Sequence, residues 1–256
     1  MAVVTPPVPP PWLQDLAGAW IFYSVLPPWP GIRPRFERIA RFAPWIGLVI
    51  GGLQAGLWWG LQGEASLLTR VCLVLVAALL LTGGLHMDGA MDTADGLGAG
   101  DRMLEAMRDS RVGASGAQAL AVLLLLKAGA LASLDGHAPW ALVWAALWGR
   151  MAPLLAVGWF PYLQPHGSAG FHRQHWAGLL AETRPGLLAG VGLVVLGLSQ
   201  GRAPVGLVGV LPALLVPGWL GRRLGGHSGD SYGACVEWTE ALALTLNAAA
   251  LHWPAT

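Results

Sequence analysis

Three aspartates that follow a long apolar run have the clearest potential for chemistry. Asp88, Asp92 and Asp95 are spaced by four and then three residues in the segment GGLHMDGAMDTADGLGAG. On an α-helix this spacing places the three carboxylates on one stripe, within roughly 60° around the axis. Carboxylates so arranged repel one another unless a cation or a substrate group lies between them. Since Mg²⁺ combines one or two carboxylates with substrate phosphates, the stripe predicts catalytic, metal-binding aspartates in a Mg²⁺-dependent site that acts on a phosphate.

The alternative interpretation of this stripe is a solvated helix end. Solvated ends usually mix charges of both signs, whereas this one is acidic. Gly83, Gly84, Gly89 and Gly96 bracket and interrupt the stripe. Glycines lower helix stability by up to ~1 kcal/mol each. We therefore expect them to permit close backbone approach, either by a ligand or by a neighbouring helix.

A basic cluster follows the aspartates along the chain. Arg108 and Arg111 flank Asp109 and Ser110, and they lie about one turn apart if the short amphipathic helix predicted here continues. Guanidinium groups bind phosphates through paired hydrogen bonds, so the two arginines are predicted to bind a diphosphate, and Asp109 and Ser110 are further candidates for substrate binding. The alternative is an interfacial helix with basic anchors.

Two further groups of polar residues are candidates for substrate binding. Lys127 and Arg150 lie inside predicted membrane spans, where an unpaired charge is costly. We expect Arg150 to face an acid or a phosphate, and Lys127 to do the same or to snorkel to an interface. The segment GRRLGGHSGDSYGACVEWTE is interpreted as a ligand-binding polar loop rather than a plain solvated loop. Its candidate residues are Arg223, Asp230, Tyr232 and Glu237.

The composition is that of a membrane protein. The 256 residues are 55% hydrophobic and 11% charged, and the charged fraction is less than half of the ~25% that is usual in soluble domains. We predict an all-α, polytopic integral membrane protein with about seven to eight transmembrane or re-entrant helices, short loops, and a short interfacial helix after the aspartates. The bilayer is then an obligatory partner. A net charge of +1 argues against a nucleic-acid partner.

The chain is predicted to contain a disordered Pro-rich leader, 1–11, and a single membrane-embedded catalytic domain, 12–256. Residues 12–26 are short for a span and fit a re-entrant or tilted helix, and 238–253 form a marginal final helix. The sequence does not settle whether these two segments cross the membrane fully. The remaining predicted spans are 42–61, 67–85, 116–134, 138–160, 186–200 and 204–221.

The basic residues predict the orientation. Eleven of the fifteen Lys and Arg residues fall in four loops, 28–41, 86–115, 161–185 and 222–237. The positive-inside rule puts these loops, which carry all the motifs, in the cytoplasm. We therefore expect an active site that faces the cytoplasm from the cytoplasmic (inner) membrane.

Several blocks resemble a known family. GGLHMDGAMDTADGLGAG, MRDSRVGASGAQAL and GRRLGGHSGDSYGACVEWTE closely resemble the signature blocks of the cobalamin synthase family, adenosylcobinamide-GDP ribazoletransferase. FYSVLPPWP and RFAPWIGLVIG are similar to the family's opening, and the resemblance runs from about Trp12 to the end. Met87 replaces the usual Leu, and Ala90-Met91 replaces Leu-Ala. These apolar exchanges leave the acids in place.

The resemblance implies a membrane enzyme that joins adenosylcobinamide-GDP to α-ribazole, or to its 5′-phosphate, with release of GMP and Mg²⁺ as cofactor. The stripe would organise Mg²⁺ and the diphosphate. Arg108, Arg111 and Arg150 would neutralise the diphosphate. Asp109, Asp230 and Glu237 would complete a second metal shell or hold the ribazole.

Two other functions are weighed against this one. A CDP-alcohol phosphotransferase also uses membrane-embedded aspartates, but its DGxxAR signature is absent, because Asp88-Gly89 is followed by Ala-Met-Asp-Thr. An ion-coupled transporter would carry its acids near the membrane midplane and often shows an inverted repeat, whereas these acids cluster at one face. A homo-oligomer is compatible with the sequence.

Overall fold

The computed structural model describes residues 9–164, 169–202 and 204–252, so residues 1–8 of the predicted leader lie outside it. The described secondary structure is helical, which confirms the all-α prediction. The helices are α1 (Pro11–Tyr23), α2 (Ala43–Gly60), α3 (Leu67–Thr82), α4 (Leu85–Gly98), α5 (Met103–Ala106), α6 (Ala114–Leu134), α7 (Ala138–Trp159), α8 (Phe171–Gln174), α9 (Leu179–Ser199), α10 (Val210–Leu224) and α11 (Gly229–His252). Short 3-10 helices are η1 (Ala40–Phe42), η2 (Gly100–Arg102), η3 (Asp135–His137) and η4 (Val205–Gly209).

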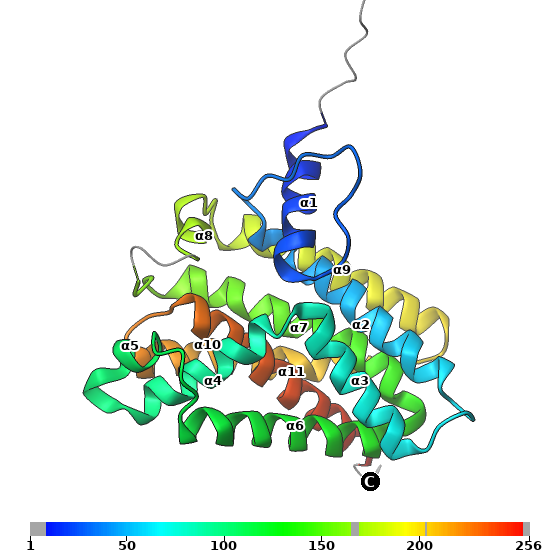
Figure 1. Cartoon of the computed structure of the whole chain (residues 1–256). Coiled ribbons are helices and arrows are strands. Elements are labelled where there is room, and N and C mark those ends of the chain that lie inside the picture. The colour runs from blue at the N-terminus through cyan, green and yellow to red at the C-terminus, as the bar shows by residue number, and fades with distance from the viewer. Residues whose placement is uncertain (1–8, 165–168, 203, 253–256) are drawn as a thin grey trace, which may run out of the picture.

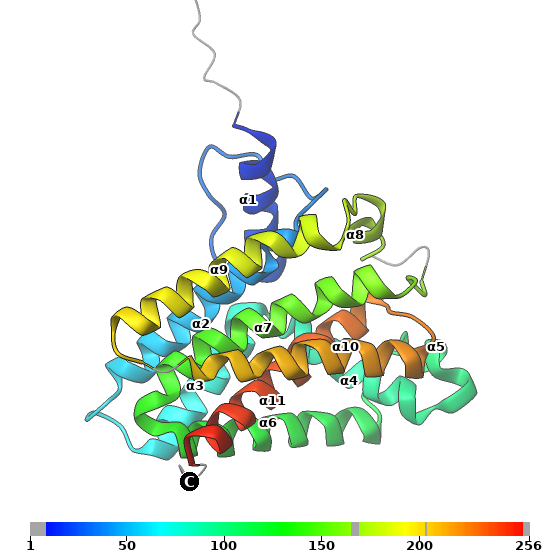
Figure 2. The same cartoon turned by 180° about the vertical axis from the view of Figure 1, so that it is seen from behind.

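The centre of the bundle is α7. It packs along α2 and α11, and Figures 1 and 2 show it enclosed by the other long helices. Its buried residues extend from Ala138 to Val157 and include Trp144 and Trp148. A helix that is apolar on all sides is expected to be buried in this way. The core is therefore built around α7.

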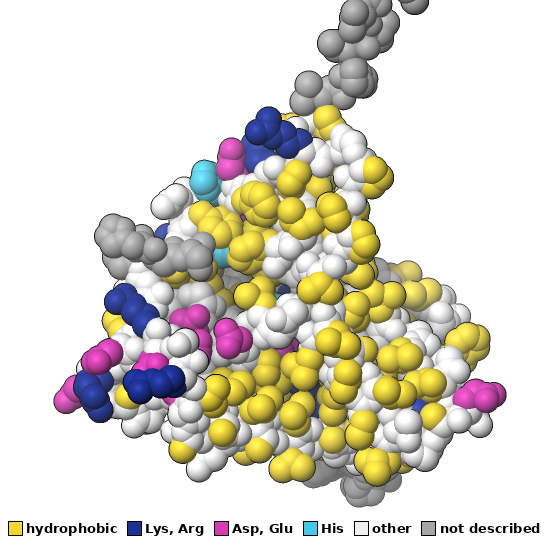
Figure 3. Space-filling view, in the orientation of Figure 1, with side chains coloured by type: hydrophobic (Ala, Val, Ile, Leu, Met, Phe, Trp, Pro, Cys, Tyr) yellow, Lys and Arg dark blue, Asp and Glu magenta, His cyan; other side chains and the backbone are white. Residues whose placement is uncertain are grey.

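Helix connections gather at two opposite ends of the bundle, whereas the α1–α2 connection lies beside α1 and the α3–α4 bend lies between the two ends (Figure 1). Figure 1 shows α5 and α8 at one end and the α2–α3 connection at the other. Figure 3 shows charged side chains gathered over the α5 end, while apolar side chains cover the flank of the bundle. Exposed apolar residues such as Leu68, Leu125 and Val191 belong to this flank or to other outer helix faces. Such an outer surface suits lipid contact.

Four stretches of the described residues are long and apolar enough to cross a membrane: 40–60, 114–159, 179–199 and 205–224. The second stretch comprises α6 and α7, which η3 joins. The number becomes five if the bent pair α3 and α4 forms one span. Several apolar helices support a polytopic membrane protein, whereas the expected seven to eight helices stay a prediction.

The first helix, α1, lies crosswise to α2 and α9 (Figures 1 and 2). Its 13 residues are fewer than the roughly 20 that a span requires. Asp15, which is fully buried, accepts hydrogen bonds from the Arg35 guanidinium at 2.8 and 2.9 Å and from Arg41 at 3.4 Å. These ion pairs attach α1 to the segment that leads into α2.

A sharp bend separates the apolar α3 from the acidic α4. Gly83 and Gly84 both adopt the left-handed conformation, with φ of 60° and 74°, which residues with a side chain rarely adopt. The two helices consequently meet at 91°. Gly83 and Gly84 are therefore required by backbone conformation, and the expectation that they permit close backbone approach by a neighbouring helix was wrong. The bend turns the aspartates toward α11.

Most of the last polar segment is helical, so the prediction of a loop through residue 237 was wrong except at residues 225–228, which connect α10 to α11. The side-chain oxygens of Ser228 and Ser231 each accept a hydrogen bond from the other residue's backbone N–H, at 3.2 and 2.8 Å. This reciprocal arrangement is a capping box, which starts a helix. It places α11 from Gly229 onward, although the glycines of the segment favour a loop.

Helices α4 and α11 cross at a point where only glycine fits. A Cβ added to Gly89 would lie 2.5 Å from the backbone oxygen of Asp230, and one on Gly233 would lie 3.0 Å from the backbone oxygen of His86. The expectation of close approach by a neighbouring helix is confirmed here. The backbone contact fixes the distance between the acids of the two helices.

We predict that Gly89→Ala destabilises the protein by about 1–3 kcal/mol, because the added methyl group must push the two backbones apart. Thermal unfolding in detergent measures the effect. Gly129→Ala on α6 is the matched control, since a Cβ there meets nothing within 4 Å. A midpoint for Gly89→Ala equal to that of Gly129→Ala would contradict the close crossing.

Candidate active site

An acidic edge forms where α4 passes α11. Asp88 and Asp92 lie one turn apart on α4, and Asp230 lies in the first turn of α11. The carboxyl group of Asp92 interacts electrostatically with Asp88, Asp230 and Asp95, and that of Asp230 interacts with Asp88. Among the described residues, no ion pair involves Asp88, Asp92 or Asp230. The edge is therefore a concentration of uncompensated negative charge.

The third aspartate of the stripe has a different environment. The two carboxylate oxygens of Asp95 accept hydrogen bonds from the backbone N–H groups of Gly113 and Gly116, both at 2.8 Å. A Cβ on either glycine would collide with this carboxylate. A carboxylate at a helix N-terminus satisfies free N–H groups and complements the helix dipole. Asp95 thus joins the end of α4 to the start of α6.

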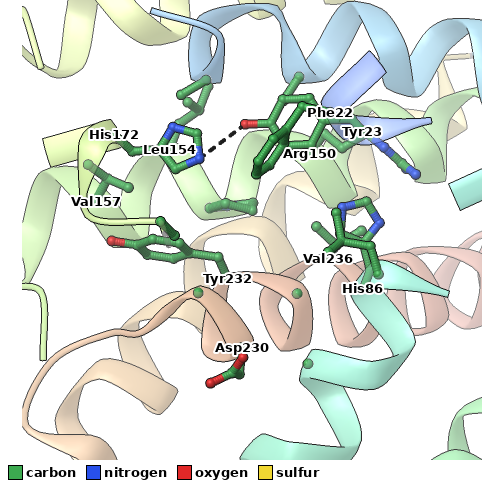
Figure 4. A pocket seen from close by; sticks show the side chains of 18 of the residues that line it. Phe22, Tyr23, His86, Arg150, Leu154, Val157, His172, Asp230, Tyr232 and Val236 are labelled. Carbon is green, nitrogen blue, oxygen red and sulfur yellow. Dashed lines mark hydrogen bonds between the residues drawn. The ribbon is translucent and has the colours of Figure 1, made fainter. Parts of the chain in front are cut away.

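A cavity of about 140 Å³ opens beside the acidic edge. Figure 4 shows the rings of Tyr23, His86, His172 and Tyr232 around this space, with Asp230 beyond Tyr232. The remaining walls are mainly apolar, and they include Phe22, Leu154, Val157 and Val236, while Asp88 and Arg150 also line the cavity. The cavity thus combines aromatic walls with carboxylates at its edge.

A buried charge cluster holds three helices together beneath this cavity. Lys127 of α6 contacts Glu237 at 2.6 Å and Glu240 at 3.0 Å, and Arg150 of α7 pairs with the same Glu240. All four side chains are at least mostly buried. An unpaired charge at such a depth would cost several kcal/mol, so each cation requires its acid. The prediction that Arg150 faces an acid is confirmed, and Lys127 is paired rather than snorkelling.

The basic segment before α6 is exposed. Arg111 donates to Asp109, with a shortest distance of 2.6 Å, and these hydrogen bonds lower the pKa of Asp109 to about 2. The helix ends at Ala106, so the condition under which Arg108 and Arg111 would lie one turn apart on it is not met. Arg108 and Ser110 are exposed in the same connection, and Arg223 is exposed in the last turn of α10. Their contacts with substrate stay a prediction.

Two histidines near the cavity are neutral. Burial lowers the pKa of His172 to about 4, and the Nε2 atom of this residue lies 3.5 Å from the Tyr23 hydroxyl. Burial likewise lowers the pKa of His227 to about 4, and its ring contacts the Ser231 hydroxyl at 2.9 Å. Both rings are therefore uncharged near pH 7.

The donor set at the acidic edge suits Mg²⁺ completed by substrate. In the part of the chain that the structure describes, no three His, Cys, Asp or Glu side chains are placed to hold a metal ion by themselves. Mg²⁺ commonly takes only one or two carboxylates and fills its other positions with phosphate oxygens and water. Asp88, Asp92 and Asp230 provide uncompensated carboxylates of that kind, whereas the oxygens of Asp95 already accept backbone hydrogen bonds.

Several residues of the site escaped sequence reasoning. Phe22 and Tyr23 reach the cavity from α1, and Tyr23 meets a residue 149 positions away. Glu240 pairs with both buried cations. Glu240 could have been inferred from the sequence, because the buried cations Lys127 and Arg150 each require an acidic partner.

Fold and site define a helical membrane protein with an acidic edge beside an aromatic cavity. Comparison of the sequence with known proteins identifies one family within this class. The family model of cobalamin-5-phosphate synthase matches residues 15–248, and the chain belongs to this family. Family membership decides against the CDP-alcohol phosphotransferase and transporter alternatives.

Named relatives agree with the family model. An adenosylcobinamide-GDP ribazoletransferase of Prochlorococcus marinus (strain MIT 9303) is 57% identical over 94% of this chain and 97% of its own length. Proteins of the same description from Thermosynechococcus vestitus and Synechocystis are 44% and 40% identical, covering 90% and 91% of this chain and 94% of each relative. No solved structure matches the chain significantly.

We predict different stability effects for substitutions of two aspartates on one helix. Asp95→Asn should lower the free energy of unfolding by about 1–2 kcal/mol, because the charged acceptor for two helix N–H groups is lost. Asp92→Asn should leave it unchanged or raise it, because repulsion from Asp88 and Asp230 is relieved. Thermal unfolding in detergent compares the variants. Equal destabilisation by both substitutions would be inconsistent with these environments.

Proposed function

We propose that this chain joins adenosylcobinamide-GDP to α-ribazole, or to its 5′-phosphate, and releases GMP. Adenosylcobinamide-GDP ribazoletransferase is the printed description of relatives that match nearly the whole chain. The observation that carries the proposal at the level of the site is the uncompensated acidic edge of Asp88, Asp92 and Asp230 beside a cavity. This arrangement suits transfer of a phosphoryl group.

The reaction exchanges one phosphorus–oxygen bond for another. A ribose hydroxyl attacks the phosphorus attached to the cobinamide arm, and the bond from that phosphorus to the bridging diphosphate oxygen breaks. GMP leaves with that oxygen, and the hydroxyl proton passes to a carboxylate. We assign proton acceptance to one of Asp88 and Asp92, since both lie at the acidic edge. Phosphoryl transfer otherwise depends on positioning and charge neutralisation.

The acidic edge is the proposed place for Mg²⁺. Asp88 and Asp92, with Asp230 across the helix crossing, would hold the ion together with diphosphate oxygens. Bound there, Mg²⁺ neutralises charge on the diphosphate and its leaving group. Asp95 remains in the proposal as the residue that holds the end of α4 in place. This role is supported by its hydrogen bonds to the start of α6.

Cationic residues would bind the diphosphate from around the edge. Arg108, Arg111 and Arg223 are exposed on connections or helix ends, where a large substrate can reach them. Arg150 lines the cavity while Glu240 holds its guanidinium. Asp109 positions Arg111, and Glu237 acts through its pairing with Lys127.

We further propose that this face of the protein lies in the cytoplasm. The four loops that hold most of the Lys and Arg residues include the connections around α5 and α8, which lie at one end of the bundle (Figure 1). The positive-inside rule supports a cytoplasmic position for that end. The bilayer would enclose the apolar flank of the bundle.

The first test of the proposed function supplies purified protein with adenosylcobinamide-GDP, α-ribazole and Mg²⁺. We expect release of GMP in a one-to-one ratio with the joined corrinoid product, measured by chromatography. Parallel reactions contain α-ribazole 5′-phosphate or omit Mg²⁺. Folded protein that releases no GMP with either ribazole form would overturn the assignment.

We predict that Asp92→Asn lowers turnover at least about 100-fold, because the amide neither accepts a proton nor neutralises Mg²⁺. The variant should still insert into membranes. Asp101→Asn is the matched control, since Asp101 is exposed in η2, and it should retain normal turnover. A Mg²⁺-induced rise in the unfolding temperature should also be present in wild type and weakened in Asp92→Asn. Near wild-type turnover of Asp92→Asn would remove this residue from the site.

A further inference from the structure

The cavity beside the acidic edge is built to hold a flat, mostly apolar group. Aromatic side chains reach it from three separate elements: Phe22 and Tyr23 from α1, His172 from α8, and Tyr232 from α11. Leu154, Val157 and Val236 supply aliphatic walls. Aromatic walls contact flat ring systems favourably through stacked and edge-to-face arrangements. The same lining contains Asp88 and Asp230, so the bound group lies next to the acidic edge.

The size of the cavity limits its occupant. Its volume is about 140 Å³, and an apolar cavity of roughly 150 Å³ binds benzene. A corrin macrocycle or a whole nucleotide is far larger than such a space. An aromatic base whose sugar stays outside is the part of either substrate that fits the size and the apolar lining of this cavity.

The proposed reaction offers two such bases, guanine and the benzimidazole of α-ribazole. Guanine carries amide, amino and ring-nitrogen groups, and each that is buried without a partner costs about 1–3 kcal/mol. Among the described residues of the lining, the buried polar atoms without a partner are Nδ1 of His86, Nδ1 of His172 and Nε of Arg150. Apart from these atoms and the carboxylates at the edge, the lining is mainly aromatic and aliphatic, so it suits a base with fewer polar groups than guanine has. A benzimidazole nucleoside has one free ring nitrogen, for which a single donor suffices.

The position of the sugar favours the same base. We place the attached ribose toward the acidic edge when the base is inside the cavity, since Asp88 and Asp230 belong both to the lining and to that edge. A hydroxyl of that ribose is the attacking group in the proposed reaction. A guanine in the cavity would instead bring the leaving group to this position.

We propose that this cavity binds the benzimidazole base of α-ribazole, and that Phe22, Tyr23 and Tyr232 determine the specificity for it. The inference depends on the proposed function for the identity of the ligand. It gives α1 a role, because this helix is too short to span a membrane yet is fastened by the buried Asp15 and delivers two of the rings. Tyr23 is the most informative of the three, since it is buried and reaches His172.

The test replaces Tyr23 by Leu, with Tyr23→Phe as the variant that keeps the ring. We expect Tyr23→Leu to raise the KM for α-ribazole about tenfold and to leave the KM for adenosylcobinamide-GDP unchanged, while Tyr23→Phe stays within about twofold of wild type. Trp12→Leu, on the exposed side of α1, is the matched control and should change neither constant. Phe22→Leu, at a half-buried position, repeats the test if Tyr23→Leu does not fold.

Binding of a free base or nucleoside tests this inference independently of the proposed function. Dimethylbenzimidazole should inhibit competitively against α-ribazole, and its binding to substrate-free protein, measured by calorimetry, should weaken about tenfold in Tyr23→Leu. Guanosine should compete only with adenosylcobinamide-GDP. A raised KM for adenosylcobinamide-GDP, or guanosine binding that depends on Tyr23, would place guanine in the cavity and overturn the inference. If wild type releases no GMP, the proposed function fails, and the binding measurement still decides whether the cavity takes the base.

Discussion

The candidate site depends on a backbone contact between α4 and α11. Gly89 allows the backbone of α4 to approach that of Asp230, and Gly233 allows the same on the other side of the crossing. No hydrophobic side chain separates the helices there, so the acids that each helix carries lie close together. Repulsion between those acids opposes the contact, and the capped start of α11 and the Asp95 attachment to α6 hold it. The surrounding fold thus holds the acids of the site close together, although no cation of the described residues neutralises them.

The acidic stripe of α4 could be predicted from the sequence because a stripe on a helix depends only on the local spacing of residues. The spacing of Asp88, Asp92 and Asp95 predicted a helix with its acids on one stripe, and the structure has that helix. The same spacing says nothing about what each carboxylate meets. Asp95 turns to the start of α6, since Gly113 and Gly116 leave room for its oxygens, and such a contact between residues 18 and 21 positions apart has no periodic signal.

Two other features, the start of α11 and the aromatic wall from α1, also depend on contacts that have no periodic signal in the sequence. The start of α11 was interpreted as a loop because Gly229 and Gly233 weaken a helix, whereas the two serines of the capping box outweigh them. Gly225 and Gly226 do lie in a connection, between α10 and α11. The aromatic wall that α1 contributes to the cavity could not be predicted from the sequence, since Tyr23 and His172 are brought together only by the tertiary fold. By contrast, the cost of burying Lys127 and Arg150 predicted correctly that Arg150 meets an acid, without naming Glu240.

The cluster of Lys127, Arg150, Glu237 and Glu240 has a consequence for biosynthesis. Both cations belong to helices that leave the ribosome before α11, which carries both acids. During insertion, α6 and α7 must therefore enter the membrane region with charges whose partners have not yet been translated. The arrival of α11 supplies the two counter-charges and Asp230 in one step. Completion of the bundle and completion of the acidic edge are consequently the same event, so a partly translated chain holds no working site.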